Sequence, residues 1–187
     1  MKKNHVNLYK YTDRIFFMQA LNLPGFPLKT INISGKSQVF DVFRKRFVAL
    51  TPEEWVRQHF LWWLKTDKGY PASLIAVEAS LKYNRMSRRA DAVVYDKTAK
   101  PVMIIECKSA MQKITQDVFD QVARYNFPFG VSYLVVTNGI EHYCCLRDEK
   151  AGKWRFLEEI PHYSGLAAGN RLPGTTPSPF NNSLNDQ

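Results

Sequence analysis

Two acids and a lysine with strand-like spacing are the residues of this sequence best suited to chemistry. Asp91 lies in an apolar run, Ala90–Tyr95, and Glu106 and Lys108 lie at the end of a second run, Val102–Lys108. Because side chains alternate between the faces of a strand, we expect Glu106 and Lys108 to share one face. Polar, turn-forming residues join the two runs and predict a hairpin.

The register of this hairpin decides whether the two acids meet. If Tyr95 lies opposite Val102, then Asp91 lies opposite Glu106, and both carboxylates project from the same face. Two neighbouring carboxylates repel each other unless a cation lies between them, and hard divalent cations prefer oxygen ligands. The pattern therefore predicts a magnesium-type site at Asp91 and Glu106, with Lys108 beside it.

Basic residues crowd the part of the chain directly before the first acid. They are Lys82, Arg85, Arg88 and Arg89. The whole sequence carries a formal net charge of +9, which favours binding to polyanions. A basic turn beside paired acids could hold a phosphate backbone against a metal ion. A solvated surface turn explains the same cluster, and both interpretations stay open.

The composition indicates one folded domain with extensions. Of the 187 residues, 45% are hydrophobic and 13% aromatic, which provides a core and excludes a disordered chain. No apolar run approaches the roughly 20 residues that span a bilayer, and no secretory signal is visible, so we expect no membrane partner and a cytoplasmic location. Cys107, Cys144 and Cys145 show neither zinc spacing nor a disulfide framework, which favours buried free thiols.

Short strands and a well-marked helix start are predicted in the first part of the chain. Residues 1–50 contain strand-like segments that we expect to form a small β extension. Thr51 at the N-cap, Pro52 at the first helical position and Glu54 two residues later form a capping box. Apolar residues at helical spacing continue over residues 56–64, so this helix should end shortly afterwards.

Strands dominate the rest of the chain, interrupted by one helix. Strand candidates lie at residues 74–81, 90–95, 102–108, 131–137, 141–147 and 154–160, and the helix at residues 115–126. The unit 102–137 should cross over right-handedly, with its two strands parallel. We therefore expect an α/β sandwich with a central mixed sheet and the core order αβββαβ.

The same pattern divides the chain into three parts. Residues 1–50 are expected to form the N-terminal extension with short strands, and residues 51–160 the main domain. From residue 161 to residue 187 glycine, proline, asparagine and serine are frequent. This composition predicts a C-terminal tail that is mobile or draped on the surface.

The acids and the lysine resemble the PD-(D/E)xK nuclease superfamily, whose fold is also called restriction-endonuclease-like. Asp91 matches the first acid of that pattern, although alanine precedes it where the superfamily often has proline. Glu106 and Lys108 match the ExK triplet. Both matches lie on the predicted strands where the superfamily carries its site.

A second motif resembles that of a smaller group of nuclease domains within this superfamily. Gln121 and Tyr125 match the QxxxY motif of the nuclease domain at the N-terminus of the motor subunit of type I restriction enzymes. No Walker-type GxxxxGK[ST] motif occurs, so this chain has no motor of its own. Further segments resemble a stand-alone bacterial family named for that domain, namely Thr51–Arg57, Arg89–Tyr95, Ile105–Lys108, Ile114–Asn126 and Tyr133–Tyr143.

The resemblance implies a metal-dependent deoxyribonuclease that uses a metal-activated water. Asp91 and Glu106 would bind Mg²⁺ or Mn²⁺ together with the backbone carbonyl of Cys107. Lys108 would orient the attacking water or neutralise charge on the phosphate. A surface salt bridge between Lys108 and one acid is the structural alternative.

Four further residues are weaker candidates. Gln121 and Tyr125 share a helix face, and the resemblance implies that they orient a ligand water or a phosphate. Packing at the sheet edge would also explain this pair. Glu54 and Glu78 are possible additional acids, although the capping box accounts for Glu54 and an exposed strand position accounts for Glu78.

Three classes of function remain open from the sequence. The leading hypothesis is a nuclease of restriction or defence/repair type that acts on DNA as a homodimer or within a larger restriction-type complex. A second is a nucleic-acid-binding or complex-assembly module that retains the nuclease fold without cleaving, which the missing motor and small size favour. A third is a protein-interaction subunit with no role in nucleic-acid binding.

Overall fold

The computed structural model of the chain describes residues 18–148, 150–167 and 174–180, apart from a few side chains such as that of Arg88. Residues 1–17 of the predicted N-terminal extension lie outside the described residues, as do residues 168–173 and 181–187 of the predicted C-terminal tail. The boundaries predicted for the three parts of the chain stay predictions.

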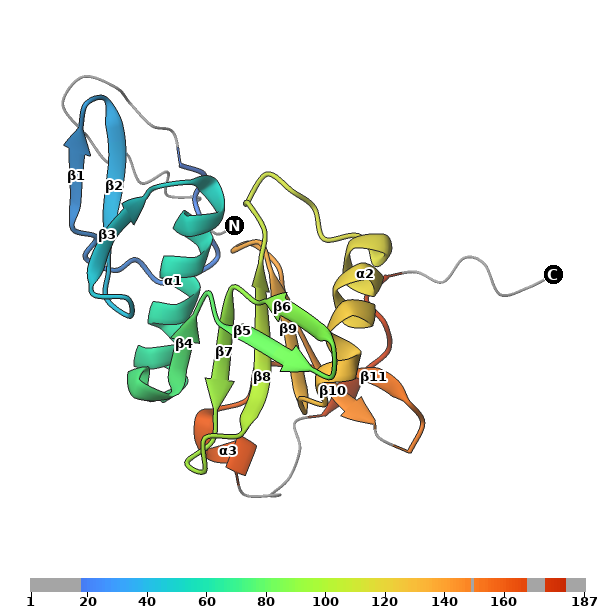
Figure 1. The fold of residues 1–187 in the computed structure, drawn as a ribbon. Coiled ribbons are helices and arrows are strands. Elements are labelled where there is room, and N and C mark those ends of the chain that lie inside the picture. Colours follow the sequence, from blue (N-terminus) through green and yellow to red (C-terminus); the bar gives the residue numbers. More distant parts are fainter. Residues whose placement is uncertain (1–17, 149, 168–173, 181–187) are drawn as a thin grey trace.

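A seven-stranded mixed sheet forms the centre of the molecule (Figure 1). Its strands are, in spatial order, β12 (Thr175–Thr176), β11 (Lys153–Leu157), β10 (His142–Asp148), β9 (Tyr133–Thr137), β8 (Pro101–Cys107), β7 (Ala92–Tyr95) and β4 (Ile75–Val77). Strands β8 and β9 are parallel, and the other neighbouring pairs are antiparallel. The predicted parallel crossover and the mixed sheet are therefore confirmed.

Two helices cover opposite faces of this sheet (Figure 1). Helix α1 (Pro52–Thr66) contributes Phe60 to a buried cluster that contains Ile105. Helix α2 (Gln116–Asn126) packs in a second cluster that contains Ile104. Adjacent residues of β8 thus point to opposite helices, which confirms the restriction-endonuclease-like α/β sandwich. In the described part of the chain, no helix has both the length and the apolar character needed to cross a bilayer.

Short helical segments complete the described part of the fold. They are η1 (Ala72–Leu74), η2 (Phe127–Phe129) and α3 (Tyr163–Ala167). Neighbouring Cys144 and Cys145 of β10 are buried in different clusters, one under each main helix. All three cysteines of the chain are buried free thiols, as the sequence predicts.

The N-terminal extension contains a small antiparallel sheet, as predicted. Strand β2 (Lys36–Asp41) lies between β1 (Thr30–Ile33) and β3 (Arg46–Ala49). Figure 1 shows this sheet beside the N-terminal end of α1. The turn between β2 and β3 reaches the same helix end, because Arg44 in that turn donates hydrogen bonds to Glu54.

Only half of the predicted capping box forms at the start of α1. The Thr51 side chain accepts a hydrogen bond from the Glu54 backbone N–H at 3.1 Å, so the N-cap prediction is confirmed. The reciprocal bond is absent among the described residues, since the Thr51 N–H donates to Ala49 O at 3.2 Å. The capping interpretation of the Glu54 carboxylate is therefore wrong: guanidinium groups hold it instead.

The register of the hairpin that carries the acids agrees with the prediction at the end next to Asp91. Val93 pairs with Ile104, and Ala92 pairs with Ile105. A bulge at the other end places Tyr95 opposite Pro101 rather than Val102. The predicted register thus holds toward Asp91 and fails only next to the turn.

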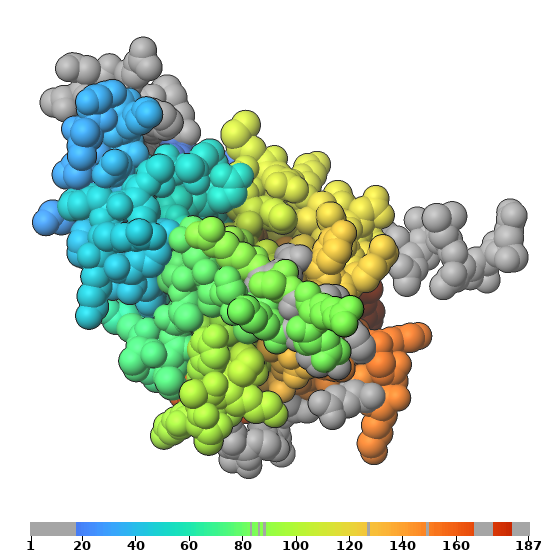
Figure 2. Space-filling view, in the orientation of Figure 1, coloured from blue at the N-terminus to red at the C-terminus, as the bar shows by residue number. Residues whose placement is uncertain are grey.

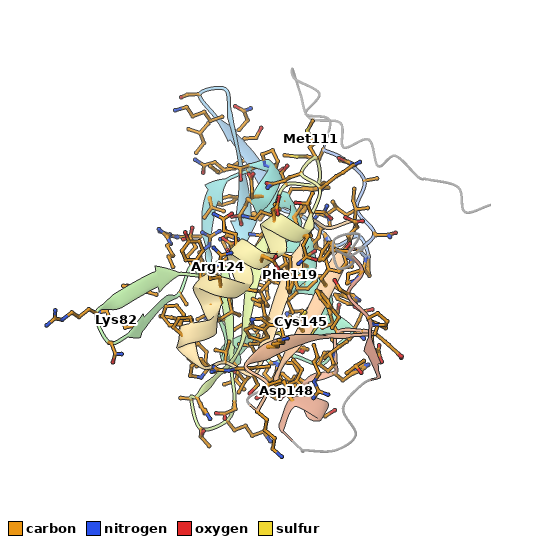
Figure 3. The ribbon with its side chains drawn as sticks, turned by 90° about the vertical axis from the view of Figure 1, so that its right-hand side faces the viewer. Lys82, Met111, Phe119, Arg124, Cys145 and Asp148 are labelled. Carbon is orange, nitrogen blue, oxygen red and sulfur yellow. The ribbon has the colours of Figure 1, made fainter. Side chains whose placement is uncertain are left out.

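The strand predicted over residues 74–81 is two separate strands. After β4 the chain turns at Glu78, whose φ of 54° is incompatible with an extended strand. Within the part of the chain that the structure describes, strand β5 (Ser80–Tyr83) then pairs only with β6 (Met86–Arg89), forming a two-stranded hairpin outside the main sheet. This basic hairpin, residues 80–89, projects from the molecule in Figure 3, with Lys82 pointing away from it.

The described part of the predicted tail packs against the main domain. Strand β12 pairs with β11, and Tyr163 of α3 is buried. The ring of Phe180 lies 5.0 Å from that of Tyr143 and 5.8 Å from that of Phe119, measured between centroids. These residues therefore lie on the surface of the main domain, where the aromatic rings gain burial by covering one face of the sheet.

Candidate functional site

A cavity of about 320 Å³ lies where the N-terminal end of α1 meets the ends of β7 and β8. Its charged lining side chains are Arg44, Glu53, Glu54, Arg57, Glu78 and Asp91. The buried residue Cys107, at the end of β8, also lines it. The cavity thus contains the first predicted acid and the middle residue of the ExK triplet.

Asp91 sits in a bend immediately before β7 and connects three strands. Its Oδ2 accepts a hydrogen bond of 2.7 Å from the backbone N–H of Cys107. Its backbone carbonyl accepts a hydrogen bond of 2.9 Å from the N–H of Glu78. These bonds fix the Asp91 carboxylate at the end of β8.

Four charged groups act on the thiol of Cys107 and so define its surroundings. Burial raises the pKa of this thiol well above its usual range, and the charge of Asp91 raises it further. Arg57 lowers this pKa, Glu106 raises it and Lys108 lowers it, in decreasing order of effect. Asp91 is hydrogen-bonded to the backbone of Cys107, and Glu106 and Lys108 are its neighbours in the sequence, so all three meet at one buried residue. Their catalytic roles stay predictions.

The two predicted acids reach this strand end from different sides. Ile105 and Cys107 belong to the cluster under α1, so alternation along β8 places Glu106 on the α2 side with Ile104. Continuing the register by one residue sets Asp91 opposite Glu106. The bend at Asp91, however, turns its carboxylate to the backbone of Cys107 and into the cavity beside α1. That both carboxylates meet at one metal ion stays a prediction.

Glu106 and Lys108 flank Cys107 at the end of β8. Glu106 is buried, with 6% of its surface exposed. Lys108 is half-buried, and its backbone N–H donates a hydrogen bond of 2.8 Å to Thr137 O on the parallel strand β9. The parallel pairing that the sequence predicts thus anchors the residue expected to act on the phosphate.

The structure does not bring Gln121 and Tyr125 to the cavity beside α1. Both lie on the exposed side of α2, where Tyr125 is 55% exposed. Helix α2 covers the opposite face of the sheet from α1, and neither residue is among the described residues that line the cavity. Their predicted role in orienting a phosphate or water stays a prediction.

The Glu54 carboxylate is buried in a network of ion pairs. Arg44 Nη2 donates to both of its oxygens, at 2.8 and 2.9 Å, and Arg57 forms a further ion pair with it. Gln58 Nε2 donates to Oε1 at 2.6 Å. Arg44 also pairs with the buried Asp41, so this arginine links the β2–β3 turn to α1.

The Glu78 carboxylate is paired with four arginines, of which Arg46 of β3 is the most distant at 4.0 Å. Arg89 Nη2 lies 2.7 Å from its Oε2, Arg44 Nη1 lies 3.0 Å from the same atom, and Arg57 Nη1 lies 3.7 Å from its Oε1. Burial pushes the pKa of Glu78 upward, but the hydrogen bond from Arg89 and the charges of Arg44 and Arg57 lower it overall. Glu78 is thus held as a carboxylate, and the interpretation as a simple exposed strand residue is wrong.

Arg44 and Arg57 are the lining residues that the sequence interpretation missed. Arg57 lies three residues after Glu54, a spacing that brings two side chains together on a helix. Arg44 begins a basic triplet between two predicted strands, which marks a charged turn. Both signals are local and common, and neither indicates a shared cavity.

The basic hairpin presents its charges in two ways. Lys82 and Arg85 are exposed, whereas Arg89 forms the ion pair with Glu78. The side chain of Arg88 lies outside the described residues. Figure 2 shows the green hairpin on the molecular surface between the α1 side and the α2 side.

The predicted metal ligands suit a hard cation by their chemistry. Among the described residues, no three His, Cys, Asp or Glu side chains form a group that could hold a metal ion. The predicted set needs only two side chains, Asp91 and Glu106, together with the carbonyl of Cys107. All three supply oxygen atoms, the donor type that Mg²⁺ and Mn²⁺ prefer.

Comparison with known proteins places the site within a family. No curated protein matches the chain. The family described as the type I restriction enzyme R protein N terminus matches residues 52–161, which is more than half of the 187 residues. The match runs from the start of α1 to just beyond β11 and contains Asp91, Glu106 and Lys108. The chain therefore belongs to the family of the type I restriction enzyme R protein N terminus.

Proposed function

We propose that this protein is a metal-dependent nuclease of restriction or defence/repair type that hydrolyses phosphodiester bonds in DNA. One observation carries the proposal: Asp91 is hydrogen-bonded to the backbone of Cys107 inside a cavity, at the strand end where Glu106 and Lys108 flank that residue. Membership of a restriction-enzyme family supports a nuclease-related role.

The proposed roles follow from the chemistry of each group. Asp91, Glu106 and the carbonyl of Cys107 would hold Mg²⁺ or Mn²⁺. When bound, this ion would supply Lewis-acid chemistry, polarising the phosphate and lowering the pKa of a water molecule. The Lys108 ammonium would neutralise charge that develops on the phosphate in the transition state.

DNA is the proposed substrate because the molecule combines a basic surface arm with this cavity. Lys82 and Arg85 are exposed on the hairpin that projects in Figure 3, and the chain carries a formal net charge of +9. Exposed cations of this kind bind the backbone through phosphate contacts without reading sequence. A homodimer or a larger restriction-type complex would position two strands, and this assembly is part of the proposal.

Cleavage assays test this function. Plasmid and single-stranded DNA should be cut in Mg²⁺ or Mn²⁺ and left intact in EDTA. Lys108→Ala should lower the rate by roughly 10²-fold, because it removes a charge that stabilises the transition state. Lys97→Ala, at an exposed turn position, is the matched control and should cut at the wild-type rate. No cleavage with either metal, or an unchanged rate for Lys108→Ala, would contradict the proposal.

A non-cleaving nucleic-acid-binding module is the second candidate. The observation that favours it is the placement of the acids: Asp91 faces the α1 side, Glu106 lies on the α2 side, and arginines hold Glu54. Such a module would bind DNA with a strong dependence on salt concentration and show no metal-dependent cleavage. The assays above separate the two candidates when binding is measured on the same preparations.

A further inference from the structure

We propose that Arg44, Arg57 and Arg89 form a binding site for a backbone phosphate of DNA, and that the Glu78 carboxylate occupies this site when no nucleic acid is bound. The inference rests on the proposed binding of DNA but not on cleavage. Glu78 is then an internal mimic of the ligand rather than a metal-binding acid.

The first support is the convergence of three guanidinium groups on one carboxylate. Arg44 comes from the β2–β3 turn, Arg57 from α1 and Arg89 from β6, and all lie within 3.7 Å of a Glu78 oxygen. Guanidinium groups recognise carboxylates and phosphates with the same planar arrangement of donors. A site assembled from separate elements around one carboxylate therefore has the chemistry to bind a phosphate.

Burial and charge make this site more than a surface ion pair. The side chains of Arg44 and Arg57 are only 11% and 9% exposed. Burial lowers the pKa of Arg57, and the charge of Arg44 lowers it further, so positive charge is concentrated here. In the described part of the chain, Arg57 Nε has no hydrogen-bond partner. This buried donor leaves the site incompletely satisfied with Glu78 in place.

The formal charges of the ion-paired residues also favour a site for an anion. Among the described residues, the ion pairs of this network join four arginines to three carboxylates: Arg44, Arg46, Arg57 and Arg89 with Asp41, Glu54 and Glu78. These seven ion-paired side chains carry a positive formal charge even with Glu78 present, while Glu53 and Asp91 line the same cavity. Loss of the Glu78 charge would increase this formal charge by one and strengthen attraction to an anion.

Of the three carboxylates in this network, that of Glu78 is best placed to be displaced by a phosphate. Its side chain is 27% exposed, whereas Asp41 and Glu54 are buried. Its φ of 54° is a left-handed value that is unusual for a residue other than glycine, and strain of this kind gathers at binding sites. The Glu78 N–H donates a hydrogen bond to Asp91 O, so Glu78 directly contacts the candidate catalytic acid. A phosphate that replaces the Glu78 carboxylate would therefore bind near Asp91.

The test is the affinity of Glu78→Gln for DNA in EDTA, where no cleavage occurs. A fluorescein-labelled duplex is titrated and its anisotropy is measured over a range of salt concentrations. We expect the variant to bind about 5–10-fold tighter than wild type, with a salt slope steeper by about one ion, because one more phosphate contact becomes available. Glu159→Gln is the matched control, since Glu159 is an exposed glutamate paired with one lysine, and it should change affinity less than twofold.

Further variants and a competition measurement make the result decisive. Glu78→Gln combined with Arg89→Gln should lose the gain, and Arg89→Gln alone should bind more weakly than Arg155→Gln, an exposed arginine of β11. Thermal melting verifies folding, and the single Arg89 variant tests the site if Glu78→Gln does not fold. Inorganic phosphate, titrated as a competitor of the duplex, separates a site for the backbone from one for the free ion.

The outcomes discriminate clearly. Tighter duplex binding that depends on Arg89 supports the proposal. A folded Glu78→Gln variant that binds DNA no better than wild type, including one that does not bind at all, overturns it. A Glu78→Gln variant that gains affinity for inorganic phosphate but not for the duplex also overturns the proposal. Failure to cleave DNA in the presence of Mg²⁺ or Mn²⁺ would reject the nuclease function. It would leave the result of the binding experiment unaffected.

Discussion

Replacing Asp91 with asparagine should reduce metal-dependent DNA cleavage by on the order of 10²–10³-fold, the cost typical of losing one group that stabilises the transition state. Asparagine keeps an oxygen that can accept the hydrogen bond from the Cys107 N–H, so the strand end should retain its geometry. The variant loses the negative charge that would hold the cation. Initial rates on plasmid DNA at saturating Mg²⁺ measure the effect, and thermal melting verifies the fold.

The control for this substitution is Asp117→Asn. Asp117 is an exposed aspartate in the first turn of α2, so its charge is removed without touching the cavity. It should cut DNA at the wild-type rate. A wild-type rate for Asp91→Asn would show that this carboxylate takes no part in the reaction.

The second large effect concerns stability. Phe60→Ala should lower the free energy of unfolding by about 3–5 kcal/mol, through lost burial and the cavity that remains. Phe60 is fully buried on the face of α1 that packs against the sheet. Its ring centroid lies 5.6 Å from that of Trp63 and 5.5 Å from that of His142, so it connects α1 to β10. Urea denaturation followed by tryptophan fluorescence measures the change.

Met111→Ala provides the comparison at the surface. Met111 is 84% exposed. It lies in the loop that follows β8 and is labelled in Figure 3. Its replacement should change the free energy of unfolding by no more than about 0.5 kcal/mol. Equal effects of the two substitutions would contradict the packing of α1 on this sheet.

The elements around the acids could be predicted because their signals are local. Apolar runs separated by a polar turn defined β7 and β8, and the pairing of Val93 with Ile104 follows from that symmetry. Thr51 followed by Pro52 fixed the start of α1 within one residue. The buried strand after α2 could pair in parallel only through a crossover, which is what β8 and β9 do.

The ion pairs around the cavity could not be predicted in the same way. Arg44 and Glu54 belong to different elements, and their contact depends on how the β2–β3 turn docks on α1. No residue spacing within either element encodes that docking. For the same reason the capping box was the natural interpretation of Glu54, and it failed when stronger charged partners were available.

Local backbone conformations explain the other differences between the predicted and the observed structure. The left-handed conformation of Glu78 divides one predicted strand into β4 and β5, although glutamate gives no signal for such a turn. The bend at Asp91 turns its carboxylate away from the face that strict alternation predicts. Gln121 and Tyr125 were placed correctly on one helix face, but helix spacing alone does not specify which way that face points.

A crystal structure of the protein soaked in Mn²⁺ tests the central claim most directly, because anomalous scattering locates this ion without reference to activity. We expect one anomalous peak at the ends of β7 and β8, within ligand distance of Asp91, Glu106 and the carbonyl of Cys107. Absence of a peak at saturating Mn²⁺, or a peak held by Glu54 and Glu78 instead, would contradict the assignment of Asp91 and Glu106 as the metal-binding acids.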